Sequence, residues 1–177
     1  MNLIFRMIWT LTSAWLTYRF GRHVGLFDEV RYRFRCLPTD LDFNLHLTNS
    51  RYASFMDIVR VALMMRNGAW GRIRAARLLP VLGSSTIRFR RAVRPFELFE
   101  VTARVLGWDE KWIFLEHKIV IGDGDVAALA IMKVAFIGPD GRVATEKLVA
   151  IIGYDGPKPA PHEALDRVRA LDEALKV

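Results

Sequence analysis

The sequence predicts an α+β fold in which one long apolar helix is covered by an antiparallel sheet. Three observations support this prediction: a short alternating strand precedes a helical apolar pattern, a series of long apolar strands follows it, and tight turns separate those strands. A tight turn joins antiparallel neighbours, because parallel strands need a longer crossover. A helix with so wide an apolar face must be buried against another element, and the sheet can supply that cover.

Residues 1–27 are expected to form an amphipathic helix ahead of the main domain. The uncharged run between Arg6 and Arg19 is 12 residues long, which is shorter than the roughly 20 residues that span a bilayer. Polar side chains share one helical face and large apolar ones the opposite face. We expect this helix to pack against the protein's own body or a partner subunit. Peripheral membrane contact through residues 1–20 and an uncleaved signal anchor are the alternatives. Secretion is not expected, because the sequence has no convincing signal-peptide cleavage site.

A strand and a long helix enclose the most polar loop of the chain. Residues 30–36, VRYRFRC, alternate apolar side chains with three arginines, as a half-buried strand does. From Tyr52 onward, apolar residues recur every three or four positions until an Asn-Gly pair indicates the end of a helix. Asn49 or Ser50 is the expected N-cap of this helix, because a short polar side chain there can accept a hydrogen bond from a free N–H group.

Four long strands and a final helix are expected in the second half of the chain. The strands cover residues 85–93, 99–105, 112–121 and 126–137. Turn sequences at residues 108–111, 122–125 and 138–141 predict an antiparallel meander. Residues 145–152 fit either a short helix or a last strand. The main domain is therefore expected to cover residues 28–153, followed by a linker and a C-terminal helix over residues 154–177.

Composition indicates one globular domain in a reducing compartment. The 177 residues are 52% hydrophobic and 25% charged, which allows a substantial core. The single cysteine, Cys36, cannot form an intramolecular disulfide and is expected to be a small core residue. No cysteine and histidine spacing fits zinc. We therefore expect a cytoplasmic protein that needs neither metal nor cofactor, with peripheral association with a membrane as the alternative.

Positive charge is concentrated in one stretch and suggests an anionic partner. The formal net charge is +7, and residues 58–96 contain nine arginines but no acidic residue. These arginines form either a solvated basic face or a site for a multiply phosphorylated ligand, which guanidinium groups bind well. Nucleic acid is not an expected partner, because no recognition motif accompanies the charge.

The functional hypothesis rests on residues 37–52, LPTDLDFNLHLTNSRY. Asp40 and Asp42 lie two positions apart, and Asn44, His46 and Asn49 follow them just ahead of the helix. The free N–H groups and the dipole at the start of a helix favour negative charge, so a polarised carbonyl oxygen can be held there. A carboxylate on one side of such a carbonyl and amide donors on the other suit acyl transfer.

This loop, with the strand, helix and meander around it, resembles a known family. It is similar to the hotdog-fold acyl-CoA thioesterases of the 4-hydroxybenzoyl-CoA thioesterase-like group, closest to the thioesterase superfamily member six branch and its bacterial relatives. That branch has a similar LPxDLDxxLHxxNxRY block and a turn similar to VLGWD at residues 105–109. The resemblance covers roughly residues 31–137. It implies a hotdog fold, an acyl-CoA substrate and a homodimer or dimer of dimers.

The resemblance also implies roles for single residues. In the wider family the loop commonly reads DxDxxGHxNNxxY, and its second aspartate attacks the thioester or activates water. Asp42 matches this position and is the expected nucleophile or general base. Leu45 replaces the glycine of the pattern and Thr48 the first of its paired asparagines. The positions that keep the pattern are Asp40, His46, Asn49 and Tyr52.

Asp42, His46 and Asn49 are the expected catalytic residues. His46 either orients Asp42 or donates to the thioester oxygen, and a purely loop-fixing role is an equal alternative. Asn49 can position water but cannot accept its proton. Asp40 is expected to be structural, because two ionised carboxylates placed close together repel each other.

Tyr52, Arg88, Arg90 and Arg91 are the expected substrate-binding residues. Tyr52 packs into the helix core, the arginines meet the CoA phosphates, and the acyl chain lies in an apolar channel between sheet and helix. His117 is expected to be a core histidine with its hydrogen bonds satisfied. Two other functional classes remain: a non-catalytic acyl-CoA or lipid-binding hotdog protein, and a scaffold for subunit assembly. A hydratase fits poorly, because the proline of its DxNPxH motif is absent.

Overall fold

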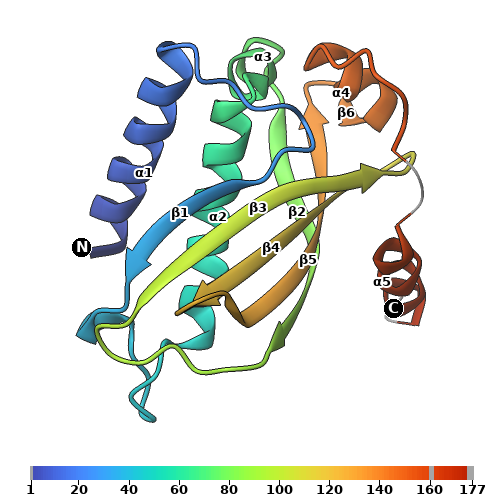
Figure 1. Ribbon diagram of the computed structural model, residues 1–177. Coiled ribbons are helices and arrows are strands. Elements are labelled where there is room, and N and C mark those ends of the chain that lie inside the picture. Colours follow the sequence, from blue (N-terminus) through green and yellow to red (C-terminus); the bar gives the residue numbers. More distant parts are fainter. Residues whose placement is uncertain (1, 160–161, 175–177) are drawn as a thin grey trace.

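A curved antiparallel sheet wraps around one long helix, α2 (Asn49–Arg66), in the computed structural model (Figure 1). The structure describes residues 2–159 and 162–174. The strands follow the order β1-β3-β4-β5-β2, and β6 pairs with β5. Their bounds are Val30–Arg35 for β1, Leu79–Phe89 for β2, Leu98–Trp108 for β3, Ile113–Ile121 for β4, Asp125–Gly138 for β5 and Gly141–Val143 for β6. The expected α+β class and hotdog architecture are confirmed.

The remaining helices lie on both sides of the sheet. α1 (Asn2–Arg19) packs against α2, on the side of the molecule where β1 also lies (Figure 1). The shorter helices are η1 (Pro38–Asp40), α3 (Ala69–Ala75) and α4 (Thr145–Ile151). α5 (Glu163–Ala174) covers part of the outer face of the sheet, where its Leu165 and Val168 join a small cluster with Phe114. A helix expected near the C-terminus is therefore present over Glu163–Ala174, while residues 160–161 and 175–177 of the expected linker and helix lie outside the described residues.

The structure corrects several expected boundaries. β2 begins six residues earlier than predicted and ends at Phe89 rather than at Val93, because residues 90–93 leave the sheet. Residues 145–152, which fitted helix or strand, mainly form helix α4. The N-cap of α2 is Thr48, not Asn49 or Ser50, so the helix begins at the first of the two predicted caps. Neither α3 nor β6 was predicted, since each is too short to show a periodic pattern.

The main core lies between α2 and the inner face of the sheet. Phe55 of α2 meets Phe34 of β1 and Phe99 of β3, with ring centroids 4.8 Å and 5.1 Å away. These rings are almost fully buried. Truncating one such ring to alanine typically costs about 3–5 kcal/mol of folding free energy, so this cluster is a major source of the packing that joins helix to sheet.

Two titratable residues in this core are held uncharged. Cys36 is fully buried just beyond β1, and burial raises the pKa of its thiol to about 11. This confirms that it is a core residue rather than a reactive thiol. His117 is also fully buried, and burial together with the nearby Arg60 charge lowers the pKa of its imidazole to about 3. The core position expected for His117 is confirmed. The expectation that its hydrogen bonds are satisfied is wrong, because neither ring nitrogen has a hydrogen-bond partner among the described residues.

The expected acyl channel between helix and sheet is not open. The apolar cavity there has a volume of about 40 Å³, at the end of α2 that is distant from the polar loop. Side chains such as Phe55, Met56 and Val59, all fully buried, fill the rest of the interface. A cavity of this size does not hold an acyl chain, so the described residues leave no open channel of the expected kind between helix and sheet in this structure.

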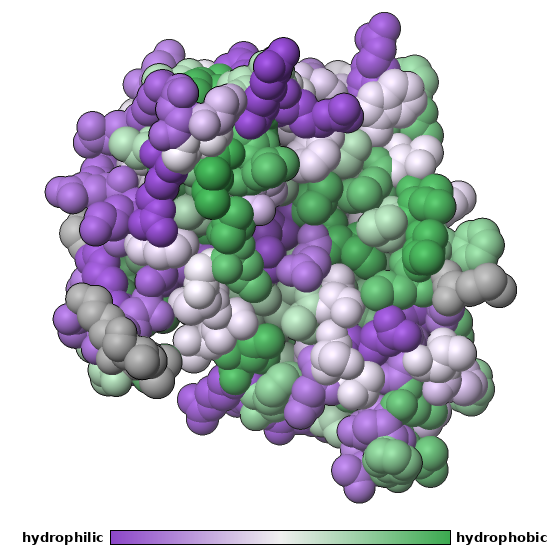
Figure 2. Space-filling view, turned by 180° about the vertical axis from the view of Figure 1, so that it is seen from behind, coloured by the Kyte–Doolittle hydropathy of each residue, from purple (hydrophilic) through white to green (hydrophobic). Residues whose placement is uncertain are grey.

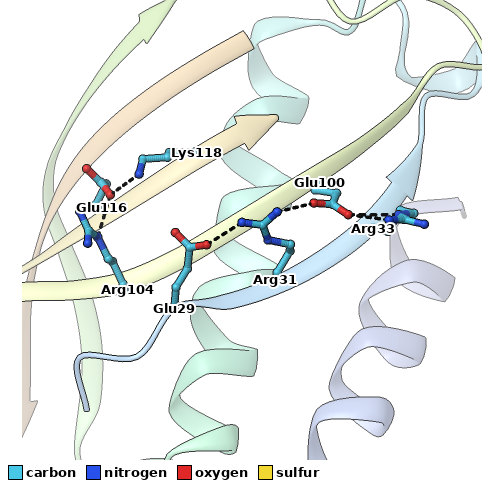
Figure 3. Close-up of polar contacts among 7 residues, drawn as sticks. All are labelled: Glu29, Arg31, Arg33, Glu100, Arg104, Glu116 and Lys118. Atoms are coloured by element: carbon cyan, nitrogen blue, oxygen red, sulfur yellow. Dashed lines mark hydrogen bonds and ion pairs between the residues drawn. The ribbon is translucent and has the colours of Figure 1, made fainter. Parts of the chain in front are cut away.

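The outer face of the sheet carries charged side chains in two networks (Figure 3). Glu100 of β3 accepts hydrogen bonds from Arg31 and Arg33 of β1, each at 2.8 Å, and Arg31 also reaches Glu29. The hydrogen bond from Arg33 is the largest influence that lowers the pKa of Glu100. A second network joins Arg104, Glu116 and Lys118 across β3 and β4. Most of the β1 and β3 outer face is thereby polar.

Candidate active site

The polar loop between β1 and α2 folds back on itself as a tight turn. The Asp42 N–H donates to the His46 carbonyl at 2.8 Å, and the Leu45 N–H donates to the Asp42 carbonyl at 3.1 Å. The Leu47 N–H donates to the carbonyl of Val93 at 3.0 Å, which attaches the loop to the segment after β2. Two stretches that are far apart in the sequence therefore meet beside the start of α2.

Asp40 is a buried structural carboxylate. It is 0% exposed, and its Oδ2 accepts hydrogen bonds from Arg6 Nη1 at 2.8 Å and from the Leu37 N–H at 2.9 Å. Arg51 Nε of α2 lies 3.5 Å from Oδ1. Arg6 also donates to the carbonyl of Arg35 at 2.7 Å. The structural role expected for Asp40 therefore agrees with its position, and its main counter-charge comes from α1.

Asp42 occupies a different environment from Asp40. It is only partly buried, and its Oδ1 accepts hydrogen bonds from the N–H groups of Asn44 at 2.9 Å and His46 at 3.3 Å. Oδ2 makes no hydrogen bond to any described residue. One carboxylate oxygen is thus fixed by the backbone, while the other is free to interact with a ligand.

Most of the predicted site residues line one open cavity of about 290 Å³. The lining includes Asp42, His46, Asn49, Tyr52, Arg90 and Arg91. Arg88 is not part of it. Sequence reasoning also missed Phe89, whose ring packs edge-on against Tyr52 with centroids 5.0 Å apart. Its position at the end of an alternating strand, directly before an arginine pair, was the signal that could have identified it.

Tyr52 links the two segments that form this cavity. The buried side chain extends from the first turn of α2, and its hydroxyl donates to the carbonyl of Arg91 at 3.4 Å. Burial raises the pKa of the Tyr52 hydroxyl, so this group remains a proton donor near neutral pH. Tyr52 therefore fixes the geometry of the cavity wall.

The start of α2 presents backbone donors at the cavity. Thr48 makes no side-chain capping hydrogen bond, and Asn49, the first helical residue, lines the cavity. The first N–H groups of a helix have no partner inside the helix. The Arg51 N–H donates to the Thr48 carbonyl at 2.8 Å, which leaves the N–H groups of Asn49 and Ser50, together with the helix dipole, to stabilise negative charge on a bound group.

The arginines of the basic stretch differ in their availability. Arg91 forms an ion pair with Asp125, whereas Arg90 has no acidic partner among the described residues. Arg60 is mostly buried beside Asp57, and burial lowers the pKa of its guanidinium. Arg90 is thus the cavity arginine best able to meet an anionic ligand.

Two kinds of feature are absent from the described part of the chain. No group of three or more histidine, cysteine, aspartate or glutamate side chains is arranged to hold a metal ion within residues 2–159 and 162–174. Across the same residues, no helix combines the length and apolar character that crossing a membrane requires.

A long helix wrapped by an antiparallel sheet, with a carboxylate loop at the start of that helix, defines a hotdog-fold protein. Residues 36–168 match the thioesterase-like superfamily, and the chain belongs to this family. The family resemblance seen in the sequence is therefore confirmed.

Curated relatives include the THEM6 proteins of several animals. Protein THEM6 of Xenopus laevis is 36% identical over 107 residues, which cover 60% of this chain and 52% of the relative. Protein THEM6 of Drosophila melanogaster is 31% identical over 134 residues, covering 75% of this chain and 68% of the relative. The chain spans about half the length of the vertebrate relatives it matches.

Solved structures share the fold at low sequence identity. The YbaW probable thioesterase from Escherichia coli has a TM-score of 0.65 at 21% identity, with 69% of this chain and 95% of that chain covered. The DHNA-CoA thioesterase from Staphylococcus aureus has a TM-score of 0.60 at 12% identity, with 84% and 96% covered. These likenesses confirm the hotdog fold.

Leu45 is held in a backbone conformation that favours glycine. Its φ is 57°, and its side chain is 64% exposed, so it gains little from burial. The family pattern has glycine at this position. We expect Leu45→Gly to raise the free energy of unfolding by roughly 1 kcal/mol, because a left-handed residue with a Cβ is strained by about 1–2 kcal/mol and glycine is not.

Urea unfolding of the wild type, Leu45→Gly and Leu45→Ala measures this effect. Alanine keeps the Cβ and serves as the matched control, so it should give much less gain than glycine. A Leu45→Gly protein that is less stable than the wild type would show that the strain assigned to this turn is wrong.

Proposed function

We propose that this protein hydrolyses acyl-CoA thioesters to a free acid and CoA, with a fatty or aromatic acyl group as substrate. The observation that carries the proposal is the shared cavity of Asp42, His46 and Asn49 at the uncapped start of α2. Membership of the thioesterase-like superfamily supports the same reaction. The lone buried thiol of Cys36 is consistent with a reducing compartment, and we place the activity in the cytoplasm.

Asp42 supplies the base or the nucleophile in this proposal. As a base, it takes a proton from water, whose oxygen attacks the thioester carbon, and the C–S bond then breaks to release the CoA thiol. As a nucleophile, its carboxylate oxygen attacks the thioester carbon, and the C–S bond breaks to release a CoA thiolate that takes up a proton from water. Water then hydrolyses the resulting anhydride, which yields the free acid and restores the Asp42 carboxylate. In both routes the carbonyl oxygen gains negative charge, and the free N–H groups at the start of α2 stabilise it.

His46 and Asn49 have supporting roles. Both line the cavity beside Asp42. His46 orients the carboxylate or donates to the thioester oxygen, and Asn49 holds the attacking water through its amide. The backbone hydrogen bonds to Asp42 Oδ1 restrict the carboxylate, so Oδ2 is the atom assigned to the reaction.

The cavity also suggests where each half of the substrate lies. Phe89 and Tyr52 form an aromatic wall that suits the acyl group near the thioester. Arg90, Arg91 and the neighbouring Arg88 are proposed to meet the CoA phosphates, with Arg90 the most important because it lines the cavity and has no acidic partner among the described residues. The acyl group extends along the open cavity rather than into the closed core.

We further propose that two copies pair through β2. This strand is at the edge of the sheet, and almost all of its residues are exposed, including Leu79, Val81, Leu82 and Phe89. A long apolar edge strand is a template for pairing with another strand. The cavity begins where β2 ends, so a second copy placed there would complete its open side.

A non-catalytic acyl-CoA or lipid-binding protein is the second candidate. Leu45 stands at the glycine position of the family pattern, and Asp42 Oδ1 is engaged by the loop's own N–H groups. In that case the cavity would bind the thioester without turnover.

Asp42→Asn separates the two candidates. We expect the wild type to release free thiol from at least one member of an acyl-CoA panel that runs from acetyl to palmitoyl and includes benzoyl and phenylacetyl. The variant should lose roughly 10²–10⁴-fold in kcat, because an amide cannot act as the base or nucleophile. Asp123→Asn, in an exposed turn, is the matched control and should retain activity. Acyl-CoA binding without thiol release by the wild type would favour the second candidate.

Arg90→Glu tests the CoA contact. We expect KM for the best acyl-CoA to rise by roughly tenfold or more with a smaller change in kcat, since a hydrogen bond to a charged group is worth about 1.5–3 kcal/mol. Arg74→Glu changes the same charge on exposed α3 and should have little effect. Equal KM values for the two variants would contradict a specific role for Arg90.

The dimer proposal predicts a mass of twice 20.3 kDa for the wild type in light scattering. Val81→Lys combined with Thr86→Lys should return the protein to a monomer, because charges on an edge strand oppose strand pairing. Leu171→Lys, on exposed α5, is the control and should stay dimeric. A monomeric wild type would refute the proposal.

A further inference from the structure

Helix α1 is docked with its polar side inward. Its buried residues are Thr10 and Ala14, which are 2% and 0% exposed. Arg6, on the same side, reaches the buried Asp40 at 2.8 Å. This face packs against α2. The contact between α1 and the body of the protein is therefore made mainly by small and polar side chains and one ion pair, with Leu3 as an apolar contribution.

The opposite side of α1 is apolar and faces solvent. Phe5 is 69% exposed, and Trp9 and Phe20 are each 78% exposed. We call this surface the outer face of α1, and it consists of Ile4, Phe5, Ile8, Trp9, Trp15, Leu16 and Phe20. Figure 2 shows apolar side chains gathered on the side of the molecule where α1 lies.

This orientation is the reverse of the usual one. A helix on the surface of a soluble domain normally turns its apolar stripe to the core and its polar face to water. Contiguous exposed apolar surface of this kind marks an interaction site rather than chance exposure. Because the inward face is held by the Arg6–Asp40 ion pair, α1 cannot roll over to bury its apolar side without taking the closer of two arginine partners from that buried carboxylate.

Charge around α1 favours an anionic surface as the partner. The first 27 residues contain no acidic residue. Arg19 and Arg22 are exposed at the C-terminal end of the helix, and neither forms an ion pair with a described residue. Basic residues beside an apolar helical face are attracted to anionic lipids, by about 1 kcal/mol for each arginine or lysine near the surface.

The exposed aromatic residues point to the same partner. Trp9 and Trp15 each combine a large apolar ring with an N–H donor, and tryptophan is enriched where hydrocarbon meets water. Since no described helix is suited to crossing a bilayer, α1 would lie parallel to the membrane plane. The exposed edge strand β2 is at the opposite end of the sheet from β1, so pairing of two copies there would leave the outer face of α1 free.

We propose that the outer face of α1 docks the protein onto the surface of an anionic lipid bilayer. The apolar side chains enter the interfacial region, and Arg19 and Arg22 contact lipid phosphates. This inference does not rest on the proposed thioesterase activity, because it follows from the orientation, charge and exposed aromatic residues of α1.

Sedimentation with lipid vesicles tests this proposal on the full chain. We expect the wild type to bind vesicles of phosphatidylcholine and phosphatidylglycerol, and to bind pure phosphatidylcholine vesicles at least several-fold more weakly. Ile8→Ser combined with Trp15→Ser should reduce binding by roughly tenfold or more, because two apolar side chains that would enter the lipid are lost. Arg19→Glu combined with Arg22→Glu should remove the preference for phosphatidylglycerol.

Matched controls keep the test decisive. Leu171→Ser removes an exposed apolar side chain from α5 and should bind vesicles as the wild type does. Circular dichroism confirms that each variant is folded. The proposal is overturned if the wild type binds neither vesicle, or if the Ile8 and Trp15 double variant binds as well as the wild type. A double variant that instead lowers the mass in light scattering, while the wild type ignores vesicles, would assign the outer face to a second copy.

Discussion

The buried ion pair between Arg6 and Asp40 is the constraint on which the arrangement around the site depends. Asp40 has no access to water, and leaving a buried carboxylate unpaired typically costs about 3–5 kcal/mol. Arg6, 34 residues earlier in the chain, is the closer of the two arginine partners of Asp40 at 2.8 Å, with Arg51 at 3.5 Å, so undocking of Arg6 would remove most of this charge compensation. The same contact fixes the end of β1 through the carbonyl of Arg35 and approaches α2 through the shared partner Asp40. One charge pair thus connects α1, β1, the polar loop and α2.

Two aspartates that lie two residues apart are given opposite environments by this arrangement. Asp40 is enclosed and neutralised by arginine, while Asp42 is partly exposed and held by backbone N–H groups at one oxygen only. Because the two carboxylates have different surroundings, one loop can provide a structural carboxylate and a carboxylate that is available for chemistry. The neutralisation of Asp40 also removes a repulsion that would otherwise act on Asp42 and on any carbonyl oxygen gaining negative charge nearby.

The local parts of this fold could be predicted from the sequence, whereas the long-range pairings could not. The alternation before Cys36 and the apolar periodicity after Tyr52 report directly which side chains face the core, so β1 and α2 were found. Asp42, His46 and Asn49 could be proposed together because they are close in the sequence, and the structure places all three at one cavity. Phe89 was missed, although it ends an alternating strand before an arginine pair, because its contact with Tyr52 depends on how β2 packs beside α2. The inward face of α1 was equally hidden, because the partner of Arg6 is set by tertiary structure.

The charged networks on the outer face of the sheet restrict how copies of the protein can associate. Individually, exposed ion pairs such as Arg31–Glu100 add little to folding stability. Two sheets that laminate, as in amyloid, need dry faces whose side chains interdigitate. A face carrying Glu29, Arg31, Arg33 and Glu100 would have to give up water around each of these charges (Figure 3). The sheet can therefore be extended sideways at an open edge. Back-to-back stacking of two copies is opposed along β1 and β3. The charges thus protect this apolar, β-rich protein from fibre growth by stacking of sheets.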